Sequence, residues 1–282
     1  MNVLSLFDGI SCGHVALDRV GIKINNYYAS EIDKYAIQVA QNNYPNTIQL
    51  GDIKSLTTVN NIDLLIGGSP CQGFSFQGKG LNFEDPRSKL FFEYVRILKE
   101  TKPKYFLLEN VKMKKEYQDI ISKYLGVEPI EINSNLVSAQ NRVRLYWTNI
   151  QGMEQPKDKG IGLNDILESN EYIRPAAIRG RNLNKENFTT QCLEVRSTNT
   201  NKSNCLTTVE KDNVLTSMPI GRHANAYKDK LPFRYYTVKE YCRLQTVSDN
   251  YMDGCSNNKA KKMLGNGWTV DVLAYILSFM EK

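Results

Sequence analysis

The first half of the chain alternates short apolar runs with longer amphipathic segments, and this alternation restricts the fold more than any other feature. The apolar runs predict buried strands at 3–7, 27–30, 62–67 and 105–109. The segments between them predict helices over 33–43, 87–101 and 114–125. Strands that alternate with helices form a parallel sheet covered on both faces, so we expect an α/β fold. Two later runs, 128–133 and 143–150, predict strands that close the sheet with antiparallel pairing.

The character of the sequence changes near residue 150. Residues 151–162 are rich in Gly, Pro and charge, which is typical of a connection. From about 179 to 213 the chain is dense in Asn, Thr and Arg and has little apolar periodicity, and helical patterns return only at 236–246 and 269–282. We therefore expect a large domain over 1–150, a small irregular insert over 151–233, and a return to the large domain over 234–282.

Composition excludes several classes of protein. Hydrophobic residues make up 41% and charged residues 23%, the ordinary balance of a globular chain, and no apolar run approaches the roughly 18 residues that span a membrane. The N-terminus lacks a basic leader, so we expect a cytoplasmic protein. Six cysteines without a CxxC pair and only two histidines predict no metal site. The net charge of +6 permits a polyanionic partner.

Three features at predicted strand ends favour a nucleotide-like ligand. The turn at Gly9 follows the first strand and opens a helix, where glycine permits close backbone approach and the helix N-terminus favours an anion. Glu31 ends the second strand about 20 residues later, where an acid accepts hydrogen bonds from ribose hydroxyls. Asp52 lies where the third strand should end. Each feature alone also fits a tight turn or a surface acid, but together they favour an adenosine-containing cofactor.

Cys71 is the candidate nucleophile. It stands in the segment Ser69-Pro70-Cys71-Gln72-Gly73, directly after a predicted buried strand, among polar and turn-forming neighbours. Most free cysteines are inert core residues, but these neighbours do not suggest burial. A thiolate presented in a rigid loop is a nucleophile, so we interpret Cys71 as catalytic.

Two further polar motifs accompany Cys71. Glu109 ends a predicted buried strand, which suits a carboxyl that holds or donates a proton; the alternative is a salt bridge to a neighbouring lysine. Arg142 and Arg144 stand two residues apart and are predicted to share one strand face, where guanidinium groups recognise phosphate or carbonyl oxygens. By itself, that pair also fits a solvated strand edge.

These motifs, in this order, resemble the DNA (cytosine-5)-methyltransferase family. The resemblance covers nearly the whole chain except about 151–233. It rests on Phe7-Asp8-Gly9, Glu31, Gly51-Asp52-Ile53, Ser69-Pro70-Cys71-Gln72, Glu109-Asn110-Val111, Gln140-Asn141-Arg142-Val143-Arg144, the segment 236–245 and Gly265-Asn266-Gly267-Trp268-Thr269-Val270. The Phe-Asp-Gly turn and Trp268 look like the eukaryotic de novo branch, whereas the compact length looks bacterial or phage-like. The family implies a Rossmann-like S-adenosylmethionine-dependent domain.

The resemblance also implies catalytic roles. Cys71 would add to carbon 6 of cytosine, Glu109 would interact with ring nitrogen 3 and the amino group, Arg144 would bind the base carbonyl, and Arg142 would support the loop. No metal is required. The methyl group would come from S-adenosylmethionine, whose pocket would comprise Phe7, Asp8, Gly9, Glu31, Ile32, Asp52, Ile53, Pro70, Leu90, Asn266 and Val270. Ile32 replaces the aromatic residue of many relatives, and Gly267-Trp268 replaces a commoner small residue.

The target would be a cytosine flipped out of duplex DNA, because a stacked base cannot present carbon 6 to a thiolate. The insert occupies the place of the family's target-recognition domain, and its middle is locally basic. Residues expected to contact DNA are Gln72, Ser75, Gln77, Arg179, Arg181, Arg196, Leu206 and Thr207. We expect a monomer and, if the enzyme serves restriction and modification, a cognate endonuclease encoded separately. The recognition sequence does not follow from these residues.

Two alternatives differ in substrate or in class. One branch with this catalytic core modifies transfer RNA, but the insert of roughly 80 residues argues against that reading. A catalytically inactive DNA-binding regulator is the other, and the presence of Cys71, Glu109 and Arg144 argues against it.

Overall fold

The computed structural model describes residues 1–57, 59–69, 89–169, 171–181, 190–195, 201–218 and 223–281. The chain forms two compact units: Met1–Asn133, Val143–Pro156 and Val270–Lys282 make up the first, and Ser134–Arg142 with Lys157–Thr269 the second. The bounds of these units differ from the expected bounds at 150 and 233. The segment that rejoins the first unit is Val270–Lys282, whereas 234–269 belongs to the second.

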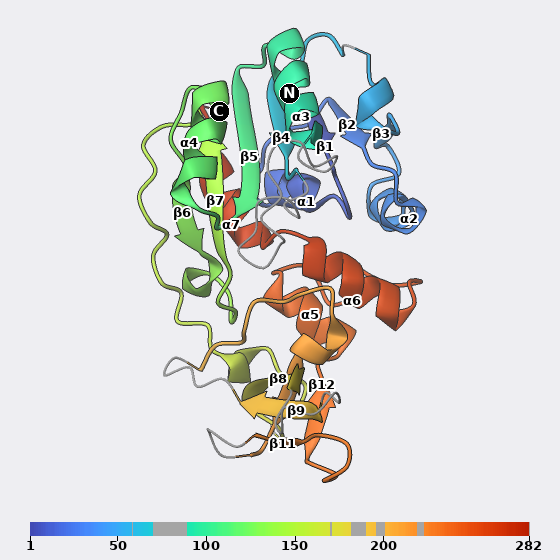
Figure 1. Ribbon diagram of the computed structural model, residues 1–282. Coiled ribbons are helices and arrows are strands. Elements are labelled where there is room, and N and C mark those ends of the chain that lie inside the picture. Colours follow the sequence, from blue (N-terminus) through green and yellow to red (C-terminus); the bar gives the residue numbers. More distant parts are fainter. Residues whose placement is uncertain are drawn as a thin grey trace. The chain divides into compact units, whose positions relative to one another are not determined.

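The first unit is built on a seven-stranded sheet in the order β3-β2-β1-β4-β5-β7-β6 (Figure 1). Its elements are β1 (Asn2–Leu6), α1 (Cys12–Arg19), β2 (Asn26–Ser30), α2 (Lys34–Asn43), β3 (Ile48–Gln49), the 3-10 turn η1 (Ile53–Ser55), β4 (Leu64–Gly67), α3 (Lys89–Thr101), β5 (Tyr105–Val111), α4 (Lys115–Leu125), β6 (Ile130–Asn133), β7 (Val143–Thr148) and α7 (Val270–Leu277). The predicted α/β fold is confirmed, including the antiparallel pairing of β7 with both β5 and β6.

The strand order reverses beside β1, and this places the helices. Connections from β1 to β3 run one way along the sheet, and those from β4 to β6 run the other way. Because crossovers between parallel strands are right-handed, α1 and α2 cover one face and α3 and α4 the other. Helix α7 lies beside α1 (Figure 1), so it covers the same face as α1.

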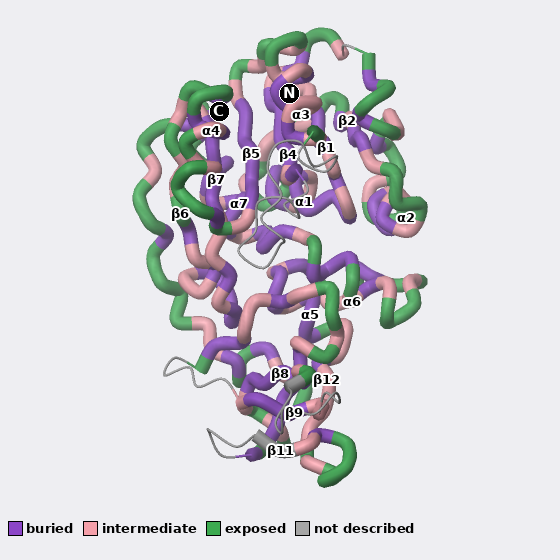
Figure 2. The backbone as a smooth tube through the Cα atoms, viewed as in Figure 1, coloured by how far each residue is buried: buried purple, intermediate pink, exposed green. Residues whose placement is uncertain are grey.

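The core of the first unit lies between the sheet and α3 and α4. Phe91 and Tyr94 of α3 and Trp147 of β7 are completely buried there, and Figure 2 shows the central strands as buried. Gly67 ends β4 where a Cβ would lie 3.0 Å from the ring of Tyr94, so this strand end has no room for a side chain.

The second unit contains a five-stranded sheet in the order β11-β9-β8-β10-β12, which the sequence did not predict. Its elements are η2 (Ser134–Leu136), η3 (Leu163–Asp165), β8 (Arg174–Arg181), β9 (Thr190–Val195), η4 (Glu210–Asp212), β10 (Val214–Thr216), β11 (His223–Asn225), β12 (Phe233–Tyr235), α5 (Val238–Leu244) and α6 (Asn257–Asn266). Neighbouring strands of this sheet pair antiparallel throughout its described residues. The insert is therefore a small sheet rather than an irregular segment.

Local chemistry sets the ends of α5, the helix predicted over 236–246. Thr237 caps it, because its hydroxyl accepts from the Glu240 N–H at 3.2 Å and the Glu240 carboxylate accepts from the Thr237 N–H at 2.9 Å. At the other end Thr246 has φ 58, which a continuing helix does not allow. The helix is consequently shorter than its apolar pattern.

Candidate active site

The carboxyl ends of β1 and β2 bring the predicted cofactor residues together. Leu6 pairs with Ser30, so Phe7 and Glu31 follow side by side. The backbone N–H of Gly9 donates to Glu31 Oε2 at 2.9 Å. Gly9 has φ 59, and a Cβ at this position would meet no atom within 4 Å. Glycine is therefore needed for the backbone conformation, and the space beside it is open.

Three backbone N–H groups orient the Glu31 carboxylate. Besides the Gly9 contact, Oε1 accepts from the N–H groups of Ile32 and Asp33 at 2.7 and 2.8 Å. These bonds hold the carboxylate at the strand end and leave it half-buried. The Ile32 side chain is 73% exposed.

Asp8 has a buried side chain, in contrast to Glu31. It is 6% exposed and accepts hydrogen bonds from the Ser11 hydroxyl and, at 2.8 Å, from the Tyr27 hydroxyl. Burial raises the pKa of Asp8 to about 6, and the negative charge of Glu31 adds to the effect while the hydroxyl donors oppose it. The carboxyl of Asp8 thus faces the protein interior.

The remaining predicted cofactor residues of the first unit differ in exposure. Asp52 is exposed and caps η1, accepting from the Lys54 N–H at 3.0 Å. Ile53 is 4% exposed, and Leu90 of α3 packs against the same core cluster. Asp52 therefore presents a carboxylate near the end of β3, as Glu31 does at the end of β2.

Glu109 and Arg144 form the best-defined polar pair at the end of β5. Arg144 Nε lies 3.0 Å from Glu109 Oε1, and the two side chains are only 14% and 11% exposed. The register explains the contact, because Val111 lies opposite Arg144 and Glu109 is two residues before Val111 on the same face. A largely desolvated carboxylate and guanidinium at a strand end can hold a polar ring by hydrogen bonds.

Asn110 connects this motif to the end of β4. Its side-chain amide donates to Ser69 Oγ at 3.2 Å and to the Ser69 carbonyl at 3.4 Å. Ser69 is the last described residue of its segment and stands two positions before Cys71 in the sequence. Cys71 itself lies outside the described residues, together with Pro70, Gln72, Ser75 and Gln77.

The expectation that Arg142 and Arg144 share one strand face is wrong. Strand β7 begins at Val143, and Arg142 belongs to the second unit. The Arg142 guanidinium, 4% exposed, donates to the carbonyls of Leu206 at 3.0 Å, Gly265 at 3.2 Å and Gly267 at 2.8 Å. These bonds stabilise the second unit, and the predicted role of Arg142 in supporting the catalytic loop stays a prediction; the ion pair with Glu109 is made by Arg144.

The last predicted cofactor residues fall in different units. Val270 is fully buried at the start of α7 in the first unit. Asn266 is exposed at the end of α6 in the second. Their contribution to a cofactor pocket stays a prediction.

The described DNA-contact candidates of the insert are partly engaged within the second unit. Arg179 pairs with Asp212, Nη2 to Oδ1 at 3.2 Å. Leu206 is 2% exposed, so its side chain offers almost no surface to a base. Thr207 is half-buried and its hydroxyl bonds Asp212 Oδ2 at 3.2 Å. Arg196 and the side chain of Arg181 lie outside the description.

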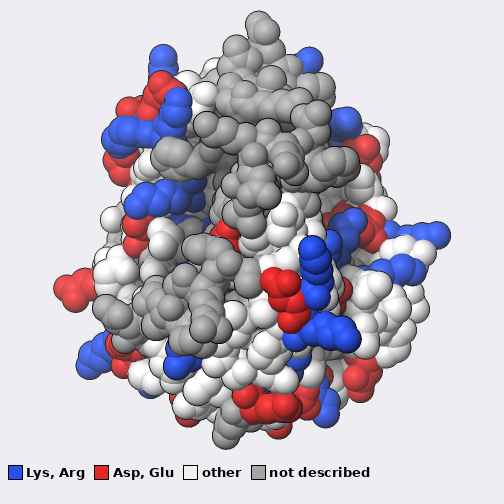
Figure 3. All heavy atoms as spheres, turned by 60° about the horizontal axis from the view of Figure 1, so that its bottom comes forward, with Lys and Arg blue, Asp and Glu red and all other residues white. Residues whose placement is uncertain are grey.

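Charges of both signs lie close together on the face drawn in Figure 3. Within the second unit, Arg179 pairs with Asp212, and Lys261 pairs with Glu210 at 2.6 Å. Opposite charges that neutralise each other weaken nonspecific attraction to phosphate.

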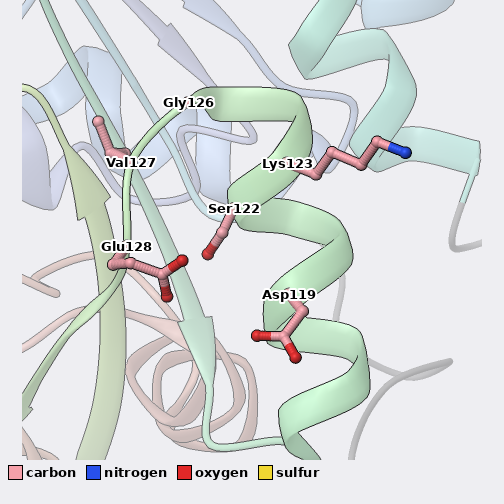
Figure 4. A pocket seen from close by; sticks show the side chains of 6 residues that line it. All are labelled: Asp119, Ser122, Lys123, Gly126, Val127 and Glu128. Atoms are coloured by element: carbon pink, nitrogen blue, oxygen red, sulfur yellow. The ribbon is translucent and has the colours of Figure 1, made fainter.

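A hollow of about 380 Å³ lies at the C-terminal end of α4 (Figure 4). Asp119 and Glu128 line it, and Lys115 pairs with both, at 2.8 and 3.4 Å. Since α4 runs back from the carboxyl end of β5, the hollow lies at the opposite edge of the sheet from Glu31 and Glu109. Within the described ranges, no cluster of His, Cys, Asp and Glu could hold a metal ion, and no helix is long and apolar enough to cross a membrane.

Tyr27 was not among the residues predicted from the sequence. It lies in a predicted strand, and nothing in its neighbourhood distinguishes it from a core tyrosine. Only the tertiary contact of its hydroxyl with Asp8 reveals it.

Comparison with known proteins decides the family. The profile of the C-5 cytosine-specific DNA methylases matches residues 1–282. The chain belongs to this family. The chain is 30% identical to the type II methyltransferase M1.ScrFI of Lactococcus lactis subsp. cremoris, over 99% of the chain and 77% of the relative. It is 34% identical to the orphan methyltransferase M.Rho11sI of Bacillus phage rho11s, over 64% of the chain.

Solved structures share the fold of this chain. A DNMT2 mutant from Spodoptera frugiperda matches with a TM-score of 0.69 and 23% identity, over 99% of the chain and 98% of that structure. The methyltransferase EhMeth of Entamoeba histolytica matches with a TM-score of 0.72 and 19% identity, over 99% and 97%. The match spans only 36% of the length of M.Rho11sI and 38% of the length of a second phage relative, the orphan methyltransferase M.SPRI of Bacillus phage SPR. The activities of these whole proteins therefore do not transfer directly to the chain.

Proposed function

We propose that this chain is a DNA cytosine-5 methyltransferase that uses S-adenosylmethionine. The observation that carries the proposal is the largely buried Glu109–Arg144 pair at the end of β5, joined through Asn110 to the segment that leads into Cys71. A positioned carboxylate, a guanidinium and a cysteine, here two positions after Ser69 in the sequence, are the groups that activation of a cytosine ring requires.

In the proposed reaction, the Cys71 thiolate adds to carbon 6 of a cytosine flipped out of the duplex. The electron pair of the 5,6 double bond moves toward carbon 5. Glu109 stabilises the protonated ring nitrogen 3, and Arg144 binds the ring carbonyl and holds Glu109 in place through their 3.0 Å contact. Carbon 5 takes the methyl group and loses its proton to a base, and the thiolate leaves as the double bond re-forms.

The residues at the strand ends fit S-adenosylmethionine, which supplies the methyl group when bound. Glu31 presents a carboxylate to ribose hydroxyls, Gly9 leaves open space at the turn, and Asp52 is exposed beyond β3. We infer that Phe7 packs on the adenine. Asn266 and Val270 remain proposed contributors.

The proposed substrate is duplex DNA, read by the insert. Base contacts are proposed to come from Thr207, Arg181 and Arg196, with Gln72, Ser75 and Gln77 near the flipped base. Leu206 contributes through its backbone, whose carbonyl accepts from Arg142. A monomer in the cytoplasm, with or without a cognate endonuclease, is part of the same proposal.

The test is methyl transfer from tritiated S-adenosylmethionine to duplex DNA, with transfer RNA as the competing substrate. Label in DNA alone, found by bisulfite sequencing at carbon 5 of cytosine in one sequence context, is the expected result. DNA containing 5-fluorocytosine should also form an adduct that survives a denaturing gel. Label in transfer RNA alone, or none in either, would refute the proposal.

A matched variant ties the chemistry to Cys71. Cys71→Ser should abolish both transfer and the adduct, because serine is far less nucleophilic at neutral pH. S-adenosylmethionine binding should remain close to wild type, since the thiol contacts the base. Turnover near the wild-type rate would exclude Cys71 as the nucleophile.

A further inference from the structure

The turn after β1 is unusually strained for a short segment. Phe7, Gly9 and Ser11 have φ values of 57, 59 and 59, so alternate residues are left-handed and two of the three are not glycine. A left-handed residue with a side chain brings its Cβ too close to the following carbonyl oxygen, which is unfavourable. Such a backbone persists only where surrounding contacts hold it.

The contacts that hold this turn converge on Asp8. Its backbone N–H donates to the Ser30 carbonyl at 3.2 Å, and its own carbonyl accepts from the Ser11 N–H at 3.1 Å. Its buried carboxylate accepts from the hydroxyls of Ser11 and Tyr27. One residue therefore joins the turn to β2 through both backbone and side chain.

Ser11 serves the turn rather than the helix that follows it. It is the N-cap of α1, where a serine hydroxyl ordinarily accepts from the first-turn N–H groups. Here it makes no such cap bond, and the hydroxyl donates to Asp8 instead. Helix α1 therefore lacks a side-chain N-cap bond, because the Ser11 hydroxyl is bonded to the Asp8 carboxylate.

Tyr27 reaches Asp8 through a space that only glycine leaves. A Cβ on Gly13 would lie 3.0 Å from the Tyr27 hydroxyl oxygen and 2.2 Å from Ile66 Cδ1. The Tyr27 ring is stacked against His14 of α1, with ring centroids 4.4 Å apart, which fixes its direction. The packing of its ring therefore directs the Tyr27 hydroxyl toward Asp8.

We propose that Asp8, Ser11 and Tyr27 form a clamp of positioning residues that holds the strained turn in the shape that binds S-adenosylmethionine. None of the three side chains needs to touch the cofactor. They act through Gly9, whose N–H the turn directs to Glu31, the proposed ribose ligand. This inference rests on the proposed function, because it assumes that the Gly9–Glu31 edge is the cofactor site.

Two variants test the clamp without dismantling the fold. Tyr27→Phe removes one donor and keeps the ring. Ser11→Gly removes the other donor and suits φ 59, so it should not lower the stability of the apo protein. The matched control is Tyr124→Phe, which removes the same hydroxyl group from an exposed tyrosine of α4.

The readouts are S-adenosylmethionine affinity by calorimetry, kcat at saturating cofactor, and the apo melting temperature. Loss of one charge-assisted hydrogen bond should raise the Kd about tenfold in each clamp variant. We expect kcat to stay within about twofold, because the Glu109–Arg144 pair is untouched. The Ser11→Gly protein should melt no lower than wild type, and Tyr124→Phe should match wild type throughout.

The outcomes separate the two proposals. If the wild type binds S-adenosylmethionine and both clamp variants bind it with the same Kd, the clamp is overturned and the proposed function stands. A lowered apo melting temperature in Ser11→Gly with unchanged Kd would also overturn it, since the hydroxyl would then serve folding alone. If wild type binds no S-adenosylmethionine, both proposals fall.

Discussion

Replacing Asp8 by Asn should stabilise the apo protein near neutral pH, and the gain should grow with pH. Burial raises the pKa of Asp8 from 3.8 to about 6, so the folded state disfavours the carboxylate that the unfolded chain carries freely. The folded state binds more protons than the unfolded state between these two values. Stability from this group is therefore highest at low pH and falls as pH rises through about 6.

The magnitude follows from that pKa change. A difference of about two units corresponds to about 3 kcal/mol of destabilisation once both states are ionised. About half of this cost is already present near pH 5, because the unfolded carboxyl is mostly ionised there. The stability difference between Asp8→Asn and wild type should consequently widen by about 1.4 kcal/mol from about pH 5 to about pH 7.5.

The assay is urea unfolding of the apo protein, followed by the fluorescence of Trp147, which is buried in the first unit. A Trp268→Phe background removes the only other tryptophan. His14 stacks on Tyr27, and burial lowers its pKa; because it is present in both proteins, its contribution largely cancels in the difference. Asp119→Asn, in an exposed pair with Lys115, is the control and should give a constant difference.

A difference that does not change with pH, or an Asp8→Asn protein less stable than wild type across the range, would refute the reasoning. Either result would mean that the Asp8 carboxylate is stabilised as strongly in the folded chain as in water. Under the proposed function, the expected result has a reason: the buried charge that lowers stability also holds the turn that is proposed to bind the cofactor.

Three further predictions concern the proposed reaction. Glu109→Gln should lower the single-turnover rate by about 10²-fold or more while DNA affinity changes little, and an unchanged rate would reduce Glu109 to a structural acid. Exchanging residues 151–233 for those of a relative with another specificity should move the methylated sequence, scored by bisulfite sequencing; an active chimera that keeps the original sequence would place recognition elsewhere. Asn266→Ala should raise the calorimetric Kd for S-adenosylmethionine and leave the apo melting temperature near wild type. An unchanged Kd with a lowered apo melting temperature would mean that the C-terminal segment has a structural role only.

Local periodicity determined most of the first unit. Strands β1, β2, β4 and β5 and helices α2 and α4 lie within a few residues of their predicted bounds, because buried strands and amphipathic helices carry their signal in neighbouring residues. The order of the motifs placed Glu31, Asp52 and Glu109 at strand ends, and parallel strands bring those ends to one edge.

The second sheet could not be found in the same way. Its core is small, with Ala176, Ile178, Leu193 and Val214 among its buried members, and β10 and β12 are three residues long. Strands this short give no period, and they are stabilised by partners distant in sequence, such as β8 with β10. The sequence therefore predicted an irregular insert where the tertiary pairing makes a sheet.

The polar contacts of the site were decided by tertiary structure alone. Arg142 and Arg144 look equivalent in sequence, yet β7 begins between them, and only Arg144 shares a face with Glu109. Asp8 reads as an ordinary acid in a turn. Its pKa and its hold on Ser11 and Tyr27 arise because β2 and α1 close over it and exclude water, which no linear pattern encodes.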